Sequence, residues 1–414
     1  MNFPIDAVRA QFPALGVTDG GIPRVYFDAP GGTQVCRSAI AAMVEHLEGG
    51  TANAGGAFAT SIGTDALSAD AHAAVADLLG AKPGEIAFGA NMTSLTLALS
   101  RALAAGWSAG DEIVLSRLDH DANVAPWLRA AADRDVRVRW IELDTEHGTL
   151  RADDLPSLLS PRTRLVAVGG ASNALGTIND LAEIARTVRA HSDALVFVDA
   201  VQSVPHEPTD VRTLGCDFLA CSPYKFFGPH VGVLWGREDL IASVDAYKVR
   251  PAATQPPAIR FETGTPSFEA QAGVIGTIHY LEWLGGALAP EATDRRARLL
   301  AAMAGCTAYE RTLGDRLLAG FQRLPGLSLF GPPTMDGRVP TFAFTLAGHH
   351  PRGVAEHLAS RGIFAWSGHF YAVEPLGQLG VIDSGGLVRV GLCHYNTADE
   401  VDCLLAALGE LVAG

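Results

Sequence analysis

The sequence predicts an α/β protein in which a mostly parallel sheet flanked by helices forms a large domain, accompanied by a smaller α+β domain. Its 414 residues exceed the length of one ordinary domain and suggest two. Apolar runs alternate with helical stretches between residues 85 and 235, as successive βα units require. One run, residues 195–198, is closed by Asp199, a pattern typical of a buried parallel strand with its polar residue at the carboxyl end. We therefore expect a large domain at residues 26–257 and a small domain at residues 1–25 and 258–414.

The elements follow from this pattern in chain order. A short amphipathic helix and a turn at residues 19–21 precede a strand at Val25 that breaks into a glycine-rich loop. Turn residues bound each later apolar run, which predicts strands at residues 85–88, 112–116, 136–143, 164–168, 195–199 and 230–235, with a helix through Leu103 after the first. The strongest break is at residues 251–257 (PAATQPP). Beyond it we expect helix over residues 272–324 with a break near Gly285 and Gly286, strands at 339–346, 363–366 and 387–392, and helices at 351–360 and 398–412.

Composition and charge narrow the class of protein. The chain is 48% hydrophobic and 18% charged, which supports a large core. Its formal net charge of -14 argues against a nucleic-acid partner or an anionic membrane surface. No apolar run approaches membrane-spanning length, and the start of the sequence has no signal-peptide pattern. The six cysteines are scattered without a CxxC pair, which predicts reduced, packed thiols, no metal site and a cytoplasmic protein.

Lysine is scarce, and one of the three lysines has unusual neighbours. Lys82 and Lys248 lie in polar, turn-like surroundings, whereas Lys225 lies between the apolar segments 217–221 and 226–228. Partial desolvation lowers the pKa of an amine and makes it a better nucleophile toward a carbonyl. The alternative is a lysine whose stem packs on an apolar wall while its ammonium group reaches solvent.

Asp199 favours the interpretation of Lys225 as a desolvated, reactive amine. Ligands of open α/β sheets bind at the carboxyl edge, where this carboxylate is expected. Pyridoxal phosphate needs such a pair, a lysine that holds its aldehyde as a Schiff base and an acid that keeps its ring nitrogen protonated. The pattern around Asp199 and Lys225 therefore predicts a pyridoxal phosphate site.

Two motifs extend this prediction to a family. Asp199-x-x-Gln202 and Ser222-x-x-Lys225 resemble the cofactor-binding segments of the cysteine desulfurase-like branch of the class V aminotransferases, and the resemblance runs from Tyr26 to the C-terminus. It implies the pyridoxal phosphate-dependent fold type I and a homodimer with shared active sites.

The resemblance assigns further cofactor contacts. In the segment at residues 89–94 it implies that the Met92 backbone and the Thr93 hydroxyl bind the cofactor phosphate, at a helix start that suits an anion. It places the His120 imidazole on the cofactor ring, Asn173 and Gln202 beside the ring hydroxyl, and Ser222 among the cofactor contacts. The R-F-E-x-G-T-P segment at residues 260–266 implies that Thr265 touches the partner subunit's cofactor phosphate. From the residues alone these are also ordinary helix caps, turn residues and a structural histidine.

Several residues expected near the substrate differ from those of the family. Arg389, in a segment that matches R-x-S-x-x-x-Y-N-T, is expected to bind the substrate α-carboxylate through its planar guanidinium. Tyr371 stands where the similar desulfurases carry the cysteine that accepts sulfur as a persulfide, and a phenol cannot replace that thiolate. Tyr224 stands where they carry histidine, and Gly55 and Gly56 where they carry basic and imidazole side chains.

These residues predict a pyridoxal phosphate enzyme that acts on an α-amino acid. Lys225 forms the Schiff base and then moves the α-proton, supported by His120 and Asp199 as further catalytic residues, while Asn173 and Tyr371 face the substrate. β-Elimination from cysteine or an S-substituted cysteine (a C–S lyase) is the first choice. Transamination, epimerisation and desulfuration by a relocated thiol are alternatives, and so is a non-catalytic binding protein, which the intact cofactor set disfavours.

Overall fold

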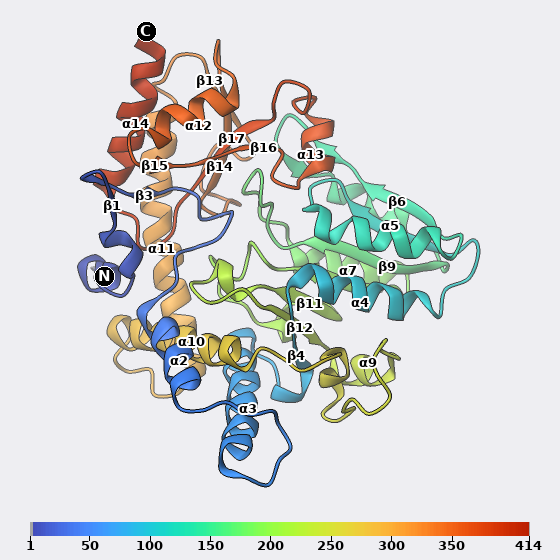
Figure 1. Ribbon diagram of the computed structural model, residues 1–414. Coiled ribbons are helices and arrows are strands. Elements are labelled where there is room, and N and C mark those ends of the chain that lie inside the picture. Colours follow the sequence, from blue (N-terminus) through green and yellow to red (C-terminus); the bar gives the residue numbers. More distant parts are fainter. Residues whose placement is uncertain (1–2, 414) are drawn as a thin grey trace.

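The computed structural model describes residues 3–413 and is built around a seven-stranded sheet (Figure 1). Across the sheet the strands lie in the order β4 (Ile86–Gly89), β12 (Gly232–Gly236), β11 (Phe218–Cys221), β10 (Leu195–Asp199), β9 (Thr163–Gly169), β5 (Glu112–Ser116) and β6 (Arg137–Ile141). Strands β11, β10, β9, β5 and β6 run parallel to one another, whereas β12 is antiparallel to both β11 and β4. The predicted α/β fold with a mostly parallel sheet is confirmed.

Both faces of this sheet are buried, because successive side chains of a strand point to opposite sides. In β9, Leu165 and Ala167 join one apolar cluster, while Val166 and Val168 join the other. The first cluster includes side chains of α4 (Met92–Ala104) and α5 (Ala125–Ala132), and the second those of α3 (Ala59–Leu79), α7 (Leu181–His191), α10 (Phe268–Leu288) and α11 (Arg295–Phe321).

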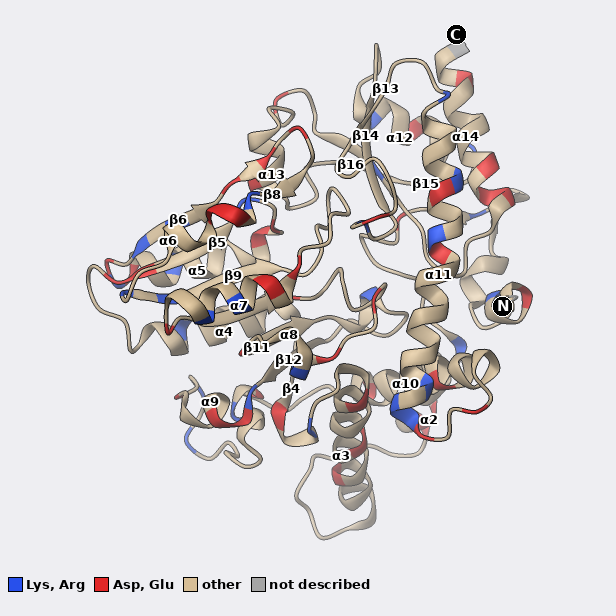
Figure 2. Ribbon diagram, turned by 180° about the vertical axis from the view of Figure 1, so that it is seen from behind, with Lys and Arg blue, Asp and Glu red and all other residues tan. Residues whose placement is uncertain are grey.

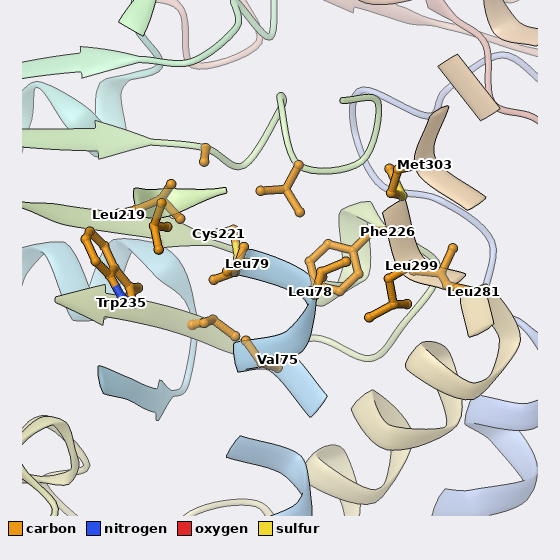
Figure 3. Packing of buried hydrophobic residues seen from close by; sticks show 14 of the residues in the cluster. Val75, Leu78, Leu79, Leu219, Cys221, Phe226, Trp235, Leu281, Leu299 and Met303 are labelled. Atoms are coloured by element: carbon orange, nitrogen blue, oxygen red, sulfur yellow. The ribbon is translucent and has the colours of Figure 1, made fainter. Parts of the chain in front are cut away.

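The close view of the second cluster shows how distant segments meet in it (Figure 3). Leu79 of α3 lies near Cys221 of β11, and Leu299 and Met303 of α11 lie beside Phe226. Phe226 directly follows Lys225, so the core reaches the base of the segment that carries the lysine.

A second, antiparallel sheet has four strands and lies toward the C-terminus of the chain (Figure 1). Its order is β13 (Leu327–Phe330), β14 (Thr341–Leu346), β17 (Leu387–Gly391) and β16 (Trp366–Gly368). Its core joins side chains of α11, α12 (Pro351–Ala359) and α14 (Ala398–Ala413). This sheet belongs to the part of the chain that we propose as the smaller domain, residues 1–25 and 258–414.

Further elements lie outside these two sheets. They are α1 (Ile5–Arg9), β1 (Thr18–Asp19), β2 (Ile22–Pro23), β3 (Val25–Tyr26), α2 (Arg37–Glu48), β7 (Leu143–Asp144), β8 (Thr149–Leu150), α6 (Leu155–Leu158), α8 (Val211–Leu214), α9 (Glu238–Ser243), β15 (Ile363–Phe364) and α13 (Val373–Gln378). The predicted strand at residues 363–366 is divided, because β15 pairs with β3 whereas β16 pairs with β17. Strand β11, which the sequence pattern did not single out, completes the sheet beside β10.

The predicted helix break near Gly285 and Gly286 lies a few residues later, after Leu288. Helix α10 runs through both glycines and ends at Leu288, and α11 begins at Arg295. A Cβ atom at Gly285 would clash with the carbonyl oxygen of Arg298, so the glycine permits a close crossing of the two helices. The glycine pair therefore reflects packing between helices and not a turn.

Charged residues lie mainly on the outer helices. Seen from behind, α11 carries both positive and negative residues and α14 carries acidic residues, whereas β11 and β12 carry neither (Figure 2). Within residues 3–413 no helix is both long and apolar enough to cross a membrane. All six cysteines are free, and only Cys403 is exposed, as expected for packed thiols.

Candidate functional site

The predicted site residues meet at the carboxyl ends of β9 and β10. A deep cavity of about 80 Å³, which we call the inner pocket, opens into a cavity of about 750 Å³, the outer chamber. The inner pocket is lined by Met92, Thr93, His120, Asn173, Asp199, Gln202, Ser222 and Lys225, and the outer chamber by Thr93, His120, Asn173, Lys225, Tyr371 and Arg389. Of the residues expected from the sequence, Thr265 alone lies elsewhere.

Lys225 ends the short 3₁₀ turn Pro223–Lys225 that follows β11, and it is buried. Its Nζ donates a hydrogen bond to the carbonyl oxygen of Pro30. Burial lowers the pKa of Lys225 to about 7, and the positive charge of Arg389 acts in the same direction. Asp199 and Asp28 oppose this shift without cancelling it. The amine is therefore largely desolvated, as the apolar neighbours in the sequence predicted.

Asp199 is the last residue of β10 and faces the inner pocket. Its Oδ1 accepts a hydrogen bond of 3.0 Å from the backbone N–H of Val201. Burial raises the pKa of Asp199 to about 6, while this hydrogen bond and the charge of Lys225 act in the opposite direction. A cationic ring nitrogen in the pocket would favour the carboxylate form in the same way as Lys225 does.

His120 is held as a neutral imidazole. Its Nδ1 accepts a 3.0 Å hydrogen bond from the backbone N–H of Ala122, which leaves the proton on Nε2. Burial, followed by the charges of Lys225 and Arg389, lowers the pKa of His120 to about 4. An uncharged ring lining both cavities is suited to stacking on a flat aromatic ligand.

Asp119 is a buried residue that the sequence analysis missed. Its Oδ1 accepts a 3.0 Å hydrogen bond from the backbone N–H of Gly169, and its Oδ2 accepts one of 2.6 Å from Asn123 Nδ2. Burial raises its pKa to about 7, and the negative charge of Asp199 contributes. Asp119 thereby ties the residue before His120 to the end of β9. Its position beside His120 was the only signal in the sequence.

The N-terminus of α4 forms another wall of the inner pocket. Asn91 caps the helix, because its side chain accepts a 2.8 Å hydrogen bond from the backbone N–H of Ser94. Met92 and Thr93 occupy the first turn, where backbone N–H groups have no partner within the helix. A Cβ atom at Gly232 would clash with Asn91, so glycine in β12 allows this close approach. The wall suits an anion such as a phosphate.

Two buried amide groups that line the inner pocket each leave an oxygen without a hydrogen-bond partner among residues 3–413. The Nδ2 of Asn173 donates to the Phe370 carbonyl at 2.9 Å, and the Nε2 of Gln202 donates to Thr341 Oγ1 at 3.1 Å. Asn173 Oδ1 and Gln202 Oε1 remain unsatisfied. Because an unsatisfied buried acceptor costs about 1–3 kcal/mol, these oxygens point to a ligand that carries a hydroxyl or an N–H donor.

Arg389, on β17, lines the outer chamber. It donates through Nη1 to the carbonyl oxygen of Asn173 at 2.9 Å, and its guanidinium carbon lies 4.3 Å from the centre of the Phe370 ring. Its Nε has no hydrogen-bond partner within the described part of the chain. Burial lowers the pKa of Arg389 to about 9, so the group stays cationic at neutral pH. A carboxylate is the natural partner for it.

Tyr224 separates Lys225 from His230. Its ring stacks on the His230 ring at 4.6 Å, and the Lys225 Nζ lies 5.1 Å from the centre of the Tyr224 ring. Burial raises the pKa of Tyr224 above its ordinary value, so the phenol keeps its proton at neutral pH.

Thr265 is exposed and lines a separate cavity together with His230. Its loop is anchored through Glu262, whose Oε1 accepts from His72 Nε2 at 2.7 Å and from the Phe88 backbone N–H at 2.8 Å. None of the cysteines, all of which are described, lines the inner pocket or the outer chamber.

Comparison with known proteins agrees with this arrangement. Residues 25–404 match the model of the family described as Aminotransferase class-V. A cysteine desulfurase of Klebsiella pneumoniae (strain 342) is 32% identical, over 99% of each chain. An aminotransferase-like protein of Gibberella zeae is also 32% identical, over 98% of each chain. The apo cysteine desulfurase of Thermococcus onnurineus NA1 is similar in structure with a TM-score of 0.88 and 28% identity, over 100% of this chain and 99% of that one. Relatives with two different activity names are equally similar, so the likeness leaves the reaction to be argued from the site.

Proposed function

Because the chain belongs to the class-V aminotransferase family, we propose that it is a pyridoxal phosphate (PLP) enzyme that cleaves the C–S bond of cysteine or an S-substituted cysteine. When bound, PLP supplies an electron sink for the bond broken at the substrate α-carbon. The inner pocket fits this cofactor, since it combines a desolvated lysine amine, a buried carboxylate and two unsatisfied amide oxygens.

Each proposed role follows from the surroundings of the residue. Lys225 holds the cofactor aldehyde and later moves the α-proton through Nζ, Asp199 keeps a proton at the ring nitrogen, and His120 covers the ring. Asn173 and Gln202 flank the ring hydroxyl, where one of the two amide oxygens would accept its proton, and Arg389 would bind the α-carboxylate. The phosphate is bound by Met92, Thr93 and Ser222, together with Thr265 of the partner subunit in a homodimer that shares its sites.

The proposed reaction balances without an added oxidant or reductant. Nζ of Lys225 removes the α-proton, the Cβ–S bond breaks, and the sulfur leaves with the bonding electrons and takes up a proton. One water enters in the hydrolysis that follows. The net change is that an S-substituted cysteine and water yield a thiol, pyruvate and ammonium.

The observation that supports elimination over desulfuration is the absence of a thiol from both cavities. All cysteines except Cys403 are buried outside them, and burial raises the pKa of Cys216 to about 12 and that of Cys221 higher still. Since only a thiolate accepts sulfur efficiently, these groups are unsuited to forming a persulfide. The loop at the cavity wall carries Tyr371 in its place.

The lowered pKa of Lys225 gives a pH dependence that can be measured. Only the neutral amine reacts with the PLP aldehyde. With a pKa of about 7, the neutral fraction rises from pH 6 to pH 8 and then levels off, whereas at the ordinary value of 10.5 it would still rise toward pH 10. We therefore expect the rate of PLP uptake by cofactor-free enzyme, followed by stopped-flow absorbance, to reach its plateau near pH 8. A rate that keeps rising to pH 10 would contradict the desolvated amine.

The reaction itself is tested with L-cysteine and S-benzyl-L-cysteine in the absence of reductant. We expect pyruvate and free thiol in equal amounts from S-benzyl-L-cysteine, measured by coupled absorbance and mass spectrometry. With L-cysteine we expect no protein-bound persulfide on any of the six cysteines, as read by intact-protein mass.

Other products would point to the alternatives. A persulfide that forms during turnover would indicate a desulfurase with a relocated thiol. Accumulation of pyridoxamine phosphate would indicate an aminotransferase, and loss of optical activity without thiol release would indicate an epimerase. If no amino acid is consumed, the result would indicate a non-catalytic binding protein.

A further inference from the structure

The outer chamber has an apolar wall. The residues that form this apolar wall, as we call it from here on, are Leu97, Ala122, Ala125, Pro126, Trp366, Phe370 and Tyr371. Leu97, Trp366 and Tyr371 are 44%, 51% and 67% exposed, although large apolar side chains are usually covered. Because these side chains line a cavity, they form an apolar surface that a ligand inside the cavity would contact.

The aromatic part of this wall is held in place by its backbone. Phe370 and Tyr371 have φ values of 54° and 56°, a left-handed conformation that bulky residues adopt only when the surroundings impose it. The Phe370 carbonyl accepts from Asn173 Nδ2 at 2.9 Å, and the Tyr371 carbonyl accepts from the Asp121 backbone N–H at 2.7 Å.

Neighbouring contacts fix the segment that follows this turn. Ala372 and Leu376 are fully buried, and Glu374 forms an ion pair with Arg117. The Tyr371 ring lies 5.7 Å from the His120 ring, with 30° between their planes. The phenol is therefore aligned beside the imidazole before any substrate binds.

The charged groups of the outer chamber disfavour an acidic substrate side chain. The ionisable groups that line the outer chamber are Asp121, Lys225, Arg389, His120, His369, Tyr224 and Tyr371. In the proposed function Lys225 and Arg389 are occupied at the α-carbon and the α-carboxylate, and His120 is neutral. A side-chain carboxylate would then face Asp121 without a lysine or arginine of its own among the lining residues.

We propose that the apolar wall selects amino acids with a large apolar side chain. Trp366 and Tyr371 contact the substituent on sulfur, and Phe370 positions Arg389. This inference rests on the proposed function for the placement of the α-carboxylate. The 750 Å³ chamber has room for a phenyl group beyond the cysteine sulfur. The apolar wall then excludes water from the departing thiol and favours apolar conjugates over free cysteine.

The first test measures binding of amino acids that cannot undergo elimination. The holoenzyme is titrated with L-alanine, L-norleucine, L-homophenylalanine, L-glutamate and L-lysine, and Kd is read by calorimetry and by the visible absorbance of the bound cofactor. Burial of a phenyl side chain should make L-homophenylalanine bind about tenfold or more tightly than L-alanine, with L-norleucine between them. Equal affinities, tighter binding of L-glutamate or L-lysine, or no binding of any amino acid would overturn the inference.

Variants assign the effect to the aromatic residues. In Tyr371→Ala and Trp366→Ala we expect the preference for L-homophenylalanine over L-alanine to fall to about threefold or less, and in Tyr371→Phe we expect it to persist. The matched control is Ile382→Ala, an apolar residue of 37% exposure that does not line the chamber. An unchanged preference in both alanine variants would contradict the assignment to these rings.

The test of side-chain selection can fail or succeed independently of the test of C–S cleavage. If the order of Kd values holds but S-benzyl-L-cysteine yields no pyruvate, C–S cleavage is wrong and the side-chain selection stands. If pyruvate forms with equal kcat/KM from S-methyl-L-cysteine and S-benzyl-L-cysteine, the proposed function stands and the selection is wrong.

Discussion

Replacement of Lys225 by alanine is expected to abolish covalent attachment of PLP and to lower turnover by about 10³-fold or more. The chain contains three lysines, and only Lys225 lines the site. Lys82 pairs with Glu238 at the surface, and Lys248 donates to the carbonyl of Ala252. Neither amine can substitute for Nζ of Lys225, which has two tasks, to hold the aldehyde and to move the α-proton.

Borohydride reduction followed by peptide mass mapping locates the pyridoxyl group. We expect the label on Lys225 in the unmodified enzyme and none in Lys225→Ala. Lys82→Ala serves as the control and should keep both the label and the activity. A label on Lys82 or Lys248, or turnover of Lys225→Ala within tenfold of the unmodified enzyme, would contradict the assignment. Circular dichroism should show an intact fold, because the side chain removed lines a cavity.

The variant Asp199→Asn should retain the fold and lose about 10²–10³-fold in turnover. The asparagine Oδ1 can still accept the hydrogen bond from the Val201 backbone N–H, so the end of β10 is preserved. The amide carries no negative charge, however, and cannot stabilise a proton at the cofactor's ring nitrogen. The electron sink is weakened although the cofactor is still held by Lys225.

In this variant turnover should therefore fall while the thermal unfolding midpoint stays unchanged. Asp239→Asn is the matched control, because Asp239 is an exposed carboxylate that pairs with Arg237 outside the site. Turnover close to that of the unmodified enzyme in Asp199→Asn would make Asp199 a strand-end residue without a role at the ring. A large fall in the unfolding midpoint would indicate a structural role instead.

Several features of the site were predictable because they depend on local pattern. The apolar run before Asp199 places the carboxylate at the end of a strand, and a carboxyl end in a parallel sheet is where ligands bind. Apolar neighbours on both sides of Lys225 predicted its burial. Other features had no local signal. Strand β11 was missed because a run of four residues between turns is ambiguous, and the glycines of α10 were misread because their reason lies on α11.

The fold class and the residues able to carry the chemistry thus follow from the amino-acid pattern, since strand pattern and residue type are local properties. The pKa values and orientations of those residues come from the three-dimensional packing. The buried Lys225 amine donates to the carbonyl oxygen of Pro30, which is 195 positions away, and Arg389 donates to that of Asn173, which is 216 positions away. Hydrogen-bond geometry, desolvation and the fixed turn at Phe370 arise where such distant segments pack together, and a side chain's pKa depends on that packing.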